Sequence, residues 1–187
     1  YLKNRNKVIV VSSAMSGETN KLVNLTKQIS NNFEPSEYDS IVATGEQASC
    51  ALIAGRLLDL GYLSRSWLGW QIPILTEGNY SHSRIVNINK KNIIKFLKLG
   101  GTPIISGFQG INSKNRITTT GRGGSDASAI MIAKFFKAKK CVIYTDVDGV
   151  FTTDPNLVPK AKKIEKISYE EMLEMSSLGT KVMQPHS

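Results

Sequence analysis

The sequence predicts an α/β fold, a three-layer αβα sandwich around a mainly parallel central sheet. Apolar runs without polar alternation, such as Val8–Val11 and Thr102–Ser106, predict strands that are buried on both faces. Segments with helical periodicity separate these runs, and alternation of strands with helices is typical of a parallel sheet covered by helices on both sides. With 187 residues, the chain is long enough for one domain with a sizeable core.

Apolar spacing and turn residues place the elements of the first half of the chain. Apolar residues three and four apart predict helices, whereas Gly and Pro mark the ends of elements. In chain order we expect a strand at Val8–Val11, a helix marked by Leu22, Leu25 and Ile29, a helical stretch Tyr38–Gly61 interrupted at Thr44–Glu46, a strand at Ser64–Leu68, a strand at Arg84–Ile88 and a helix at Lys90–Leu99. The segment Trp67–Asn79 has no clear pattern.

The same signals continue through the second half. In order we expect the strand Thr102–Ser106, the loop Gly107–Gly110, a polar excursion or hairpin at Ile111–Thr120, a helix at Ser125–Ala138, a strand at Cys141–Thr145, a long loop Asp146–Pro159 and a last helix that starts with the capping-box pattern Ser168–Glu171. In parallel α/β sheets, ligands bind at the carboxyl ends of strands. The loops Ser13–Asn20, Gly107–Gly110 and Asp146–Pro155 are therefore expected to share one edge of the sheet.

The formal net charge of +9 has three interpretations: nucleic-acid binding, lysines on solvated helix faces, and steering of anionic small substrates. The sequence lacks an interleaved aromatic and basic stripe of the kind that stacks bases, so nucleic acid ranks last. No apolar run is long enough to span a membrane, so we expect no membrane partner.

The cysteines and histidines predict neither disulfides nor a metal site. Cys50 and Cys141 lie in apolar segments, which favours reduced core residues of a cytoplasmic protein. His82 and His186 are isolated, so no zinc site is expected.

The stretch Thr118–Ser128 (TTTGRGGSDAS) is the strongest candidate for a binding site. Its glycines permit positive φ and close approach of a ligand, and Arg122 offers a planar fork for a carboxylate or phosphate. A helix is expected to begin at Ser125 and Asp126, so free N–H groups and the positive end of the helix dipole would favour an anion. The alternative is an ordinary turn in which Ser125 is the N-cap.

For three further features, the chemistry of the residues leaves two interpretations open. The carboxylates of Asp146, Asp148 and Asp154 sit in a loop that either closes over a nucleotide or only forms turns, and the EF-hand spacing does not fit. Glu46 either binds an ammonium group or is an exposed glutamate favoured by a helix dipole. Lys181 either neutralises a phosphate or is a surface lysine.

Taken together, six motifs resemble those of the aspartate kinases of the amino-acid kinase family, in the family's order and over nearly the whole chain. They are Val10–Val23 (VVSSAMSGETNKLV), Ala43–Gln47 (ATGEQ), Ser106–Gly110 (SGFQG), Thr118–Ser128, Tyr144–Pro155 (YTDVDGVFTTDP) and Glu165–Gln184. The resemblance implies transfer of the γ-phosphoryl group of ATP to the side-chain carboxylate of L-aspartate, with Mg²⁺ carried largely by the ATP phosphates.

The resemblance also implies roles for individual residues. Lys181 and Asp126 would be catalytic, with Lys181 approaching the phosphates and Asp126 organising the phosphoryl-transfer centre. The implied aspartate-binding residues are Thr19, Glu46, Arg122, Gly123, Gly124 and Ser125. The implied nucleotide-binding residues are Ser13, Thr145, Asp146, Phe151, Thr152, Thr153, Asp154, Pro155 and Lys181. No residue of the chain is expected to form a metal site of its own.

The chain departs from the family pattern at its front end. Nothing before Val8 matches the family's Lys-Phe-Gly-Gly-Thr-Ser strand and loop, and the regulatory ACT domains are absent, so we expect residues 1–187 to be most of a catalytic domain with little activity alone. The full-length protein is expected to be a cytoplasmic homo-oligomer. Two alternatives are a sister kinase that acts on glutamate, acetylglutamate or UMP, and a non-enzymatic regulatory or basic binding module.

Overall fold

A computed structural model describes residues 7–121, 123–145, 149–153, 157–158, 160–168 and 170–171 of the chain. The chain divides into two units, Tyr1–Cys141 and Val142–Ser187, and each is described by itself. No helix among the described residues is both long and apolar enough to cross a membrane.

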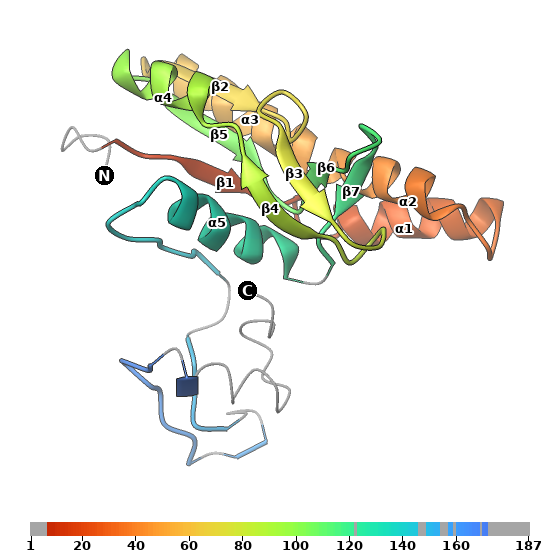
Figure 1. Ribbon diagram of the computed structural model, residues 1–187. Coiled ribbons are helices and arrows are strands. Elements are labelled where there is room, and N and C mark those ends of the chain that lie inside the picture. Colours follow the sequence, from red (N-terminus) through yellow and green to blue (C-terminus); the bar gives the residue numbers. More distant parts are fainter. Residues whose placement is uncertain are drawn as a thin grey trace. The chain divides into compact units, whose positions relative to one another are not determined.

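A parallel three-stranded sheet lies at the centre of the first unit (Figure 1). Its order is β1 (Val10–Ser12), β5 (Thr102–Ser106) and β2 (Ser64–Trp67), so β5 is the middle strand. All residues of β5 are buried, as the unbroken apolar run predicts. The first strand begins at Val10 rather than at Val8, and Val10 and Val11 are only half-buried because β1 lies at an edge of this sheet.

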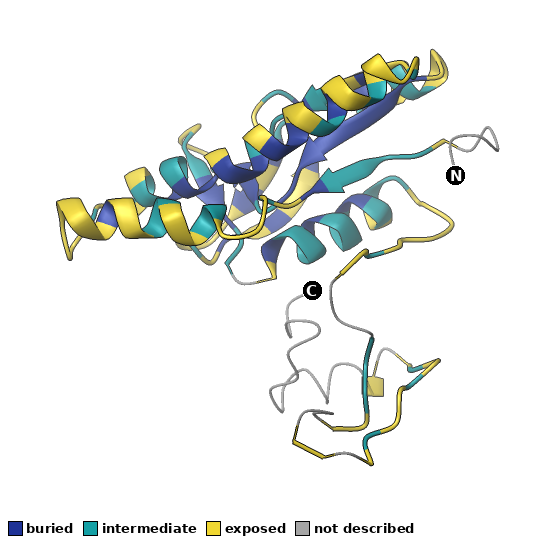
Figure 2. Cartoon of the chain, turned by 180° about the vertical axis from the view of Figure 1, so that it is seen from behind, coloured by how far each residue is buried: buried dark blue, intermediate teal, exposed yellow. Residues whose placement is uncertain are grey.

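Neighbouring residues of β5 point into two different cores, which confirms the three-layer arrangement. Ile104 packs with Cys50 and Ala54 of helix α3 (Thr44–Asp59). The next residue, Ile105, packs in a cluster that includes Ile93 of α4 (Lys91–Lys98) and Ile132 of α5 (Gly124–Phe135). Side chains alternate between the faces of a strand, so α3 covers one face and α4 and α5 cover the other. Figure 2 shows the buried residues concentrated along this sheet and the inner sides of the helices.

A second, mixed sheet has the order β4 (Arg84–Ile88), β3 (Ile74–Glu77), β6 (Gln109–Ile111) and β7 (Ile117–Thr119). The antiparallel pair β6–β7 is the hairpin expected in the polar excursion, although β6 begins inside the segment expected to be a loop. Strand β3 lies in the stretch without a clear pattern. It does alternate between buried and exposed residues, but a strand this short carries too little periodicity to be recognised.

Helices α1 (Glu18–Ile29) and α2 (Pro35–Val42) precede α3. The expected interruption of the stretch Tyr38–Gly61 is confirmed, because α2 ends at Val42 and α3 begins at Thr44. Pro35 occupies the first turn of α2, where its missing N–H needs no partner, and the side chain of Glu34 accepts hydrogen bonds from the backbone N–H groups of Ser36 and Glu37.

Two expectations about the segment Cys141–Thr145 are wrong. These residues form no strand, and Cys141 is exposed rather than part of a core, whereas Cys50 is buried. Tyr144 is 84% exposed, so the apolar composition of this segment is not matched by burial. An apolar run becomes a strand only where a neighbouring strand pairs with it, and composition does not report that neighbour.

In the second unit, the capping box predicted at Ser168–Glu171 is confirmed. The Ser168 N–H donates to Glu171 Oε2 at 2.8 Å, and the Glu171 N–H donates to Ser168 Oγ at 3.1 Å. Phe151 and Lys163 form an antiparallel bridge, flanked by the hydrogen bond from the Ile164 N–H to the Val150 carbonyl.

Candidate functional site

The loops that follow β1 and β5 meet the start of α5 at one edge of the parallel sheet (Figure 1). The Gly107 N–H donates to the Ser12 carbonyl at 3.0 Å. A β-carbon at Gly107 would lie 3.1 Å from Ser125 Cα, so the chain after β5 passes directly beside the first turn of α5. Two of the three loops expected to share an edge therefore do so. The third belongs to the second unit.

The loop after β1 also contacts the start of α3. A β-carbon at Gly45 would lie 3.0 Å from Ala14 Cβ, so the glycine permits this close approach. Helix α1 begins after Gly17, which has a φ of 80°, and Thr19 is half-buried in its first turn. Ser13 is exposed in the same loop.

Glu46 lies in the first turn of α3 and is only 4% exposed. Its Oε1 accepts a hydrogen bond from the Ala14 N–H at 3.2 Å, whereas Oε2 is buried without a partner among the described residues. Burial raises the pKa of Glu46 from 4.5 to about 7, and the hydrogen bonds from the Glu46 and Ala14 N–H groups only partly oppose this shift. The interpretation of Glu46 as an exposed helix-start glutamate is therefore wrong. One carboxylate oxygen is left for a cationic or hydrogen-donating ligand.

A glycine turn precedes α5. Gly121 and Gly123 have φ values of 77° and 69°, a region that favours glycine. Gly123 is the N-cap residue of α5 and the helix begins at Gly124, so the interpretation of Ser125 as an ordinary N-cap is wrong. No side chain among the described residues caps this helix. The Gly124 N–H donates to the Gly121 carbonyl at 3.0 Å, so the next N–H groups and the positive end of the dipole are what suit an anion here.

Tight contacts fix the start of α5 against the loop after β5. The Phe108 N–H donates to Ser128 Oγ at 3.0 Å, and the Ser128 hydroxyl donates to the Gly124 carbonyl at 2.7 Å. A β-carbon at Gly124 would overlap Thr120 Oγ1 and lie 2.6 Å from Phe108 Cδ2. Only glycine fits at this position without displacing its neighbours.

Replacing Gly124 by alanine is expected to destabilise the protein by about 1–3 kcal/mol, because Thr120 and Phe108 must move aside. Gly55 of α3 is a matched control, since it lies exposed in a helix with nothing near its missing β-carbon. Gly55→Ala is expected to stabilise the protein by roughly 0.5–1 kcal/mol through helix propensity. Urea unfolding of the two variants measures both effects. Equal changes of the same sign would contradict this account of Gly124.

Asp126 follows in the first turn of α5 and is half-buried. Burial raises the pKa of its carboxyl group. Gly123, Gly124, Ser125 and Asp126 are thus consecutive residues at the helix start, close to the loop after β5 and, through Gly107 and Ser12, to the loop after β1.

Asp39 of α2 is a site-supporting residue that the sequence did not reveal. It is fully buried and accepts four hydrogen bonds, from the N–H and hydroxyl groups of Ser81 and of Thr119, at 2.7–2.9 Å. The Ser81 carbonyl would lie 2.9 Å from a β-carbon at Gly121, and Thr119 ends the strand that leads into the glycine turn. Asp39 therefore anchors both segments that hold this turn.

The remaining candidate residues are not described together with this group. Thr145, Phe151, Thr152 and Thr153 belong to the second unit, where the Thr152 N–H donates to the Lys162 carbonyl at 2.9 Å. The positions of Arg122, Asp146, Asp148, Asp154, Pro155 and Lys181 lie outside the described residues. Within the described ranges, no three His, Cys, Asp or Glu side chains gather to hold a metal ion.

Comparison with known proteins matches the family model "Amino acid kinase family" over residues 1–187. The chain is 50% identical over 177 residues to "Aspartate kinase Ask_LysC" of Stutzerimonas stutzeri, covering 95% of the chain and 43% of the relative. It is 50% identical over 182 residues to an aspartokinase of Geobacillus stearothermophilus, covering 97% of the chain and 45% of the relative. The chain thus spans less than half the length of these curated relatives.

Solved structures with the same fold include the aspartate kinase from Synechocystis, with a TM-score of 0.81 and 43% identity. That match covers 98% of the chain and 30% of the solved structure. Aspartokinase III of E. coli, solved in complex with aspartate and ADP, has a TM-score of 0.78 and 29% identity, and the match covers 89% of the chain and 38% of that structure.

Proposed function

We propose that this chain, which belongs to the amino acid kinase family, is catalytic-domain sequence of an aspartate kinase. The enzyme would transfer the γ-phosphoryl group of ATP to the side-chain carboxylate of L-aspartate and form 4-phospho-L-aspartate. The names of the similar proteins and the complex of one relative with aspartate and ADP support this substrate pair.

The observation that carries the proposal is Glu46. Its carboxylate is 4% exposed, and one of its oxygens lacks a hydrogen-bond partner among the described residues. Burying such a charged group costs folding free energy unless a ligand supplies the missing hydrogen bond or counter-charge. The α-ammonium group of aspartate offers both a positive charge and N–H donors. An acceptor without a cationic group, such as UMP, would leave the same oxygen unpaired.

The aspartate carboxylates would bind the other side of the site. The start of α5, with Gly123 and Ser125, would supply N–H donors and the positive dipole end, and Gly124 would lie beside them, its own N–H donating to the Gly121 carbonyl. Arg122 would add a bidentate contact to a carboxylate, and Thr19 in the first turn of α1 would line the same space. The ammonium group of the substrate would then face Glu46, and a carboxylate group would face the start of α5. These two pairs of opposite charges would orient the substrate in the site.

In the proposed reaction, a side-chain carboxylate oxygen of aspartate attacks the γ-phosphorus of ATP. A bond forms between that oxygen and phosphorus, the bond from phosphorus to the β–γ bridging oxygen breaks, and ADP leaves with the bond's electron pair. Such transfers depend on positioning and charge neutralisation rather than on a protein nucleophile. Lys181 would neutralise charge on the phosphates, and Asp126 would organise the groups around the transferring phosphoryl.

The nucleotide would be bound by Ser13 and by residues of the second unit, namely Thr145, Asp146, Phe151, Thr152, Thr153, Asp154 and Pro155. Mg²⁺ would neutralise phosphate charge and would be held mainly by the ATP phosphates. A homo-oligomeric, cytoplasmic enzyme remains part of the proposal, consistent with the free, buried thiol of Cys50.

An acceptor panel tests the proposal on the full-length protein. ADP release is measured with aspartate, glutamate, acetylglutamate and UMP, and acyl phosphate is trapped as the hydroxamate. We expect ADP release and hydroxamate with aspartate alone. Turnover of UMP or acetylglutamate together with inactivity toward aspartate would overturn the proposed substrate.

A further inference from the structure

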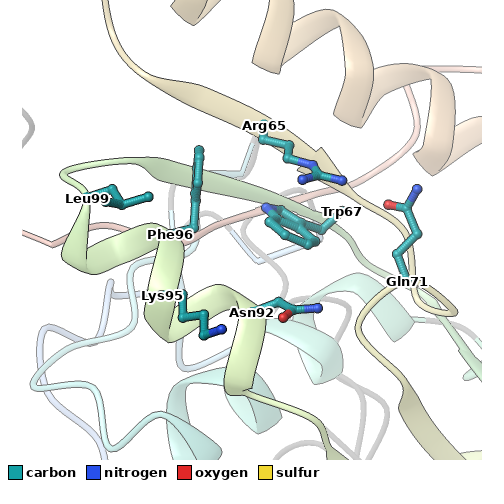
Figure 3. Close-up of a pocket in the computed structure, with 7 residues that line it drawn as sticks. All are labelled: Arg65, Trp67, Gln71, Asn92, Lys95, Phe96 and Leu99. Atoms are coloured by element: carbon teal, nitrogen blue, oxygen red, sulfur yellow. The ribbon is translucent and has the colours of Figure 1, made fainter.

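A pocket of about 450 Å³ lies against β2 and α4 (Figure 3). It is lined by Arg65, Trp67, Gln71, Asn92, Lys95, Phe96 and Leu99. None of these residues belongs to the proposed aspartate or nucleotide sites, so the proposed function leaves the pocket without a role.

The residues that line the pocket come mainly from one face of strand β2 and one face of helix α4. Arg65 and Trp67 are two residues apart on β2 and share one face of the strand. Asn92, Lys95, Phe96 and Leu99 follow the spacing of one helical face along α4 and its C-cap. The strand face and the helix face flank this open pocket, and Figure 3 shows the side chains from both that line it.

The pocket combines an aromatic wall with two cations. Trp67 and Phe96 meet edge to face, with ring centroids 6.0 Å apart, and the Arg65 guanidinium carbon lies 4.3 Å from the centroid of Trp67. Lys95 adds a second positive charge from the helix. Neither Arg65 nor Lys95 forms an ion pair within the described part of the chain, and no acidic side chain lines the pocket.

A third donor belongs to Trp67, one of the residues that line the pocket. Trp67 is 5% exposed, and its buried Nε1–H has no hydrogen-bond acceptor among the described residues. A buried indole N–H usually finds an acceptor. The pocket lining therefore carries two exposed cations and one buried donor that has no acceptor within the described part of the chain.

We propose that this pocket binds a small organic anion, with its carboxylate or phosphate held by Arg65 and Lys95 and its apolar part against Phe96 and Leu99. Arginine and lysine both favour such anions, and the aromatic wall favours a ligand with an apolar body.

Fluorine NMR of the full-length protein labelled with 5-fluorotryptophan tests this site directly, with the Trp67 resonance assigned by its loss in Trp67→Phe. The probes are benzoate and phenyl phosphate, which distinguish a carboxylate from a phosphate ligand, and benzamide as the neutral control. We expect a saturable shift of the Trp67 resonance with at least one anion and none with benzamide. Equal shifts with benzamide, or no saturable shift with either anion at millimolar concentration, would overturn the proposal.

Variants on the same helix provide the matched control. Arg65→Gln and Lys95→Gln are each expected to weaken anion binding at least tenfold, whereas Lys91→Gln, on α4 but outside the pocket lining, is expected to leave it unchanged. Lys91 and Lys95 are exposed, so the free Trp67 resonance should keep its position in their variants. Arg65→Gln is expected to shift the free resonance, because the Arg65 guanidinium lies over the Trp67 ring, so its effect is measured from the anion titration alone. Equal weakening by Lys91→Gln and Lys95→Gln would show that net charge rather than this pocket attracts the anion, and would refute the site.

Discussion

Replacing Glu46 by glutamine is expected to weaken aspartate binding and, at the same time, to make the folded protein more stable above pH 7. Glutamine can still accept the hydrogen bond from the Ala14 N–H, but it cannot pair with an ammonium charge. Loss of a charge-assisted pair costs about 1.5–3 kcal/mol, which corresponds to roughly a 10- to 150-fold rise in the KM for aspartate. The KM for ATP is expected to change little.

The stability gain follows from the pKa of Glu46, which burial raises from 4.5 to about 7. Because the folded protein holds this proton more tightly than the unfolded chain, the wild type loses stability as pH rises from about 4.5 to about 7. Glutamine does not ionise and avoids this loss. The variant is therefore expected to be more stable than the wild type by about 2–3 kcal/mol at pH 8, with no difference below pH 4.5.

Kinetics and urea unfolding across pH check both effects. In the wild type, the KM for aspartate is expected to fall as pH rises through about 7, because only the ionised carboxylate pairs with ammonium. Glu77→Gln is the control, since Glu77 is exposed on β3 and should change neither quantity. A Glu46→Gln variant that is less stable at pH 8 and binds aspartate normally would assign Glu46 a purely structural role.

Replacing Asp39 by alanine is expected to cost about 3–5 kcal/mol of folding free energy, because it leaves the buried donors of Ser81 and Thr119 unpaired. Asp39→Asn should recover most of this loss. The amide oxygen can accept from the two N–H groups that now bind Oδ2, and the amide NH₂ can donate to the two hydroxyl groups, which can also accept.

Urea unfolding of both variants measures the difference. Asp59→Ala serves as the control, because Asp59 is exposed and its pair with Arg56 should contribute less than about 1 kcal/mol. If Asp39→Asn is as unstable as Asp39→Ala, the negative charge rather than the hydrogen-bond pattern holds the glycine turn. If neither variant is destabilised, Asp39 does not anchor it.

The sequence alone was sufficient for features that depend on neighbouring residues in the chain. The buried strand Thr102–Ser106, the break between α2 and α3, the helix after the glycine turn and the capping box at Ser168 all rest on local apolar spacing or on local hydrogen bonds. The family motifs predict that Glu46 and Gly123–Asp126 share one site, and this assignment stays a prediction.

Tertiary structure decided which side chains are buried and what they meet. Glu46 could equally have been an exposed helix-start residue, and its burial depends on the loop after β1, far away in the sequence. The role of Asp39 arises from two segments that only the second sheet brings to α2. The strand expected at Cys141–Thr145 failed because pairing, unlike composition, requires a neighbour. Burial and strand pairing depend on segments that are distant in the sequence and that pack together only in the folded protein. A local sequence pattern therefore does not identify the residues that will bury a side chain or pair with a strand.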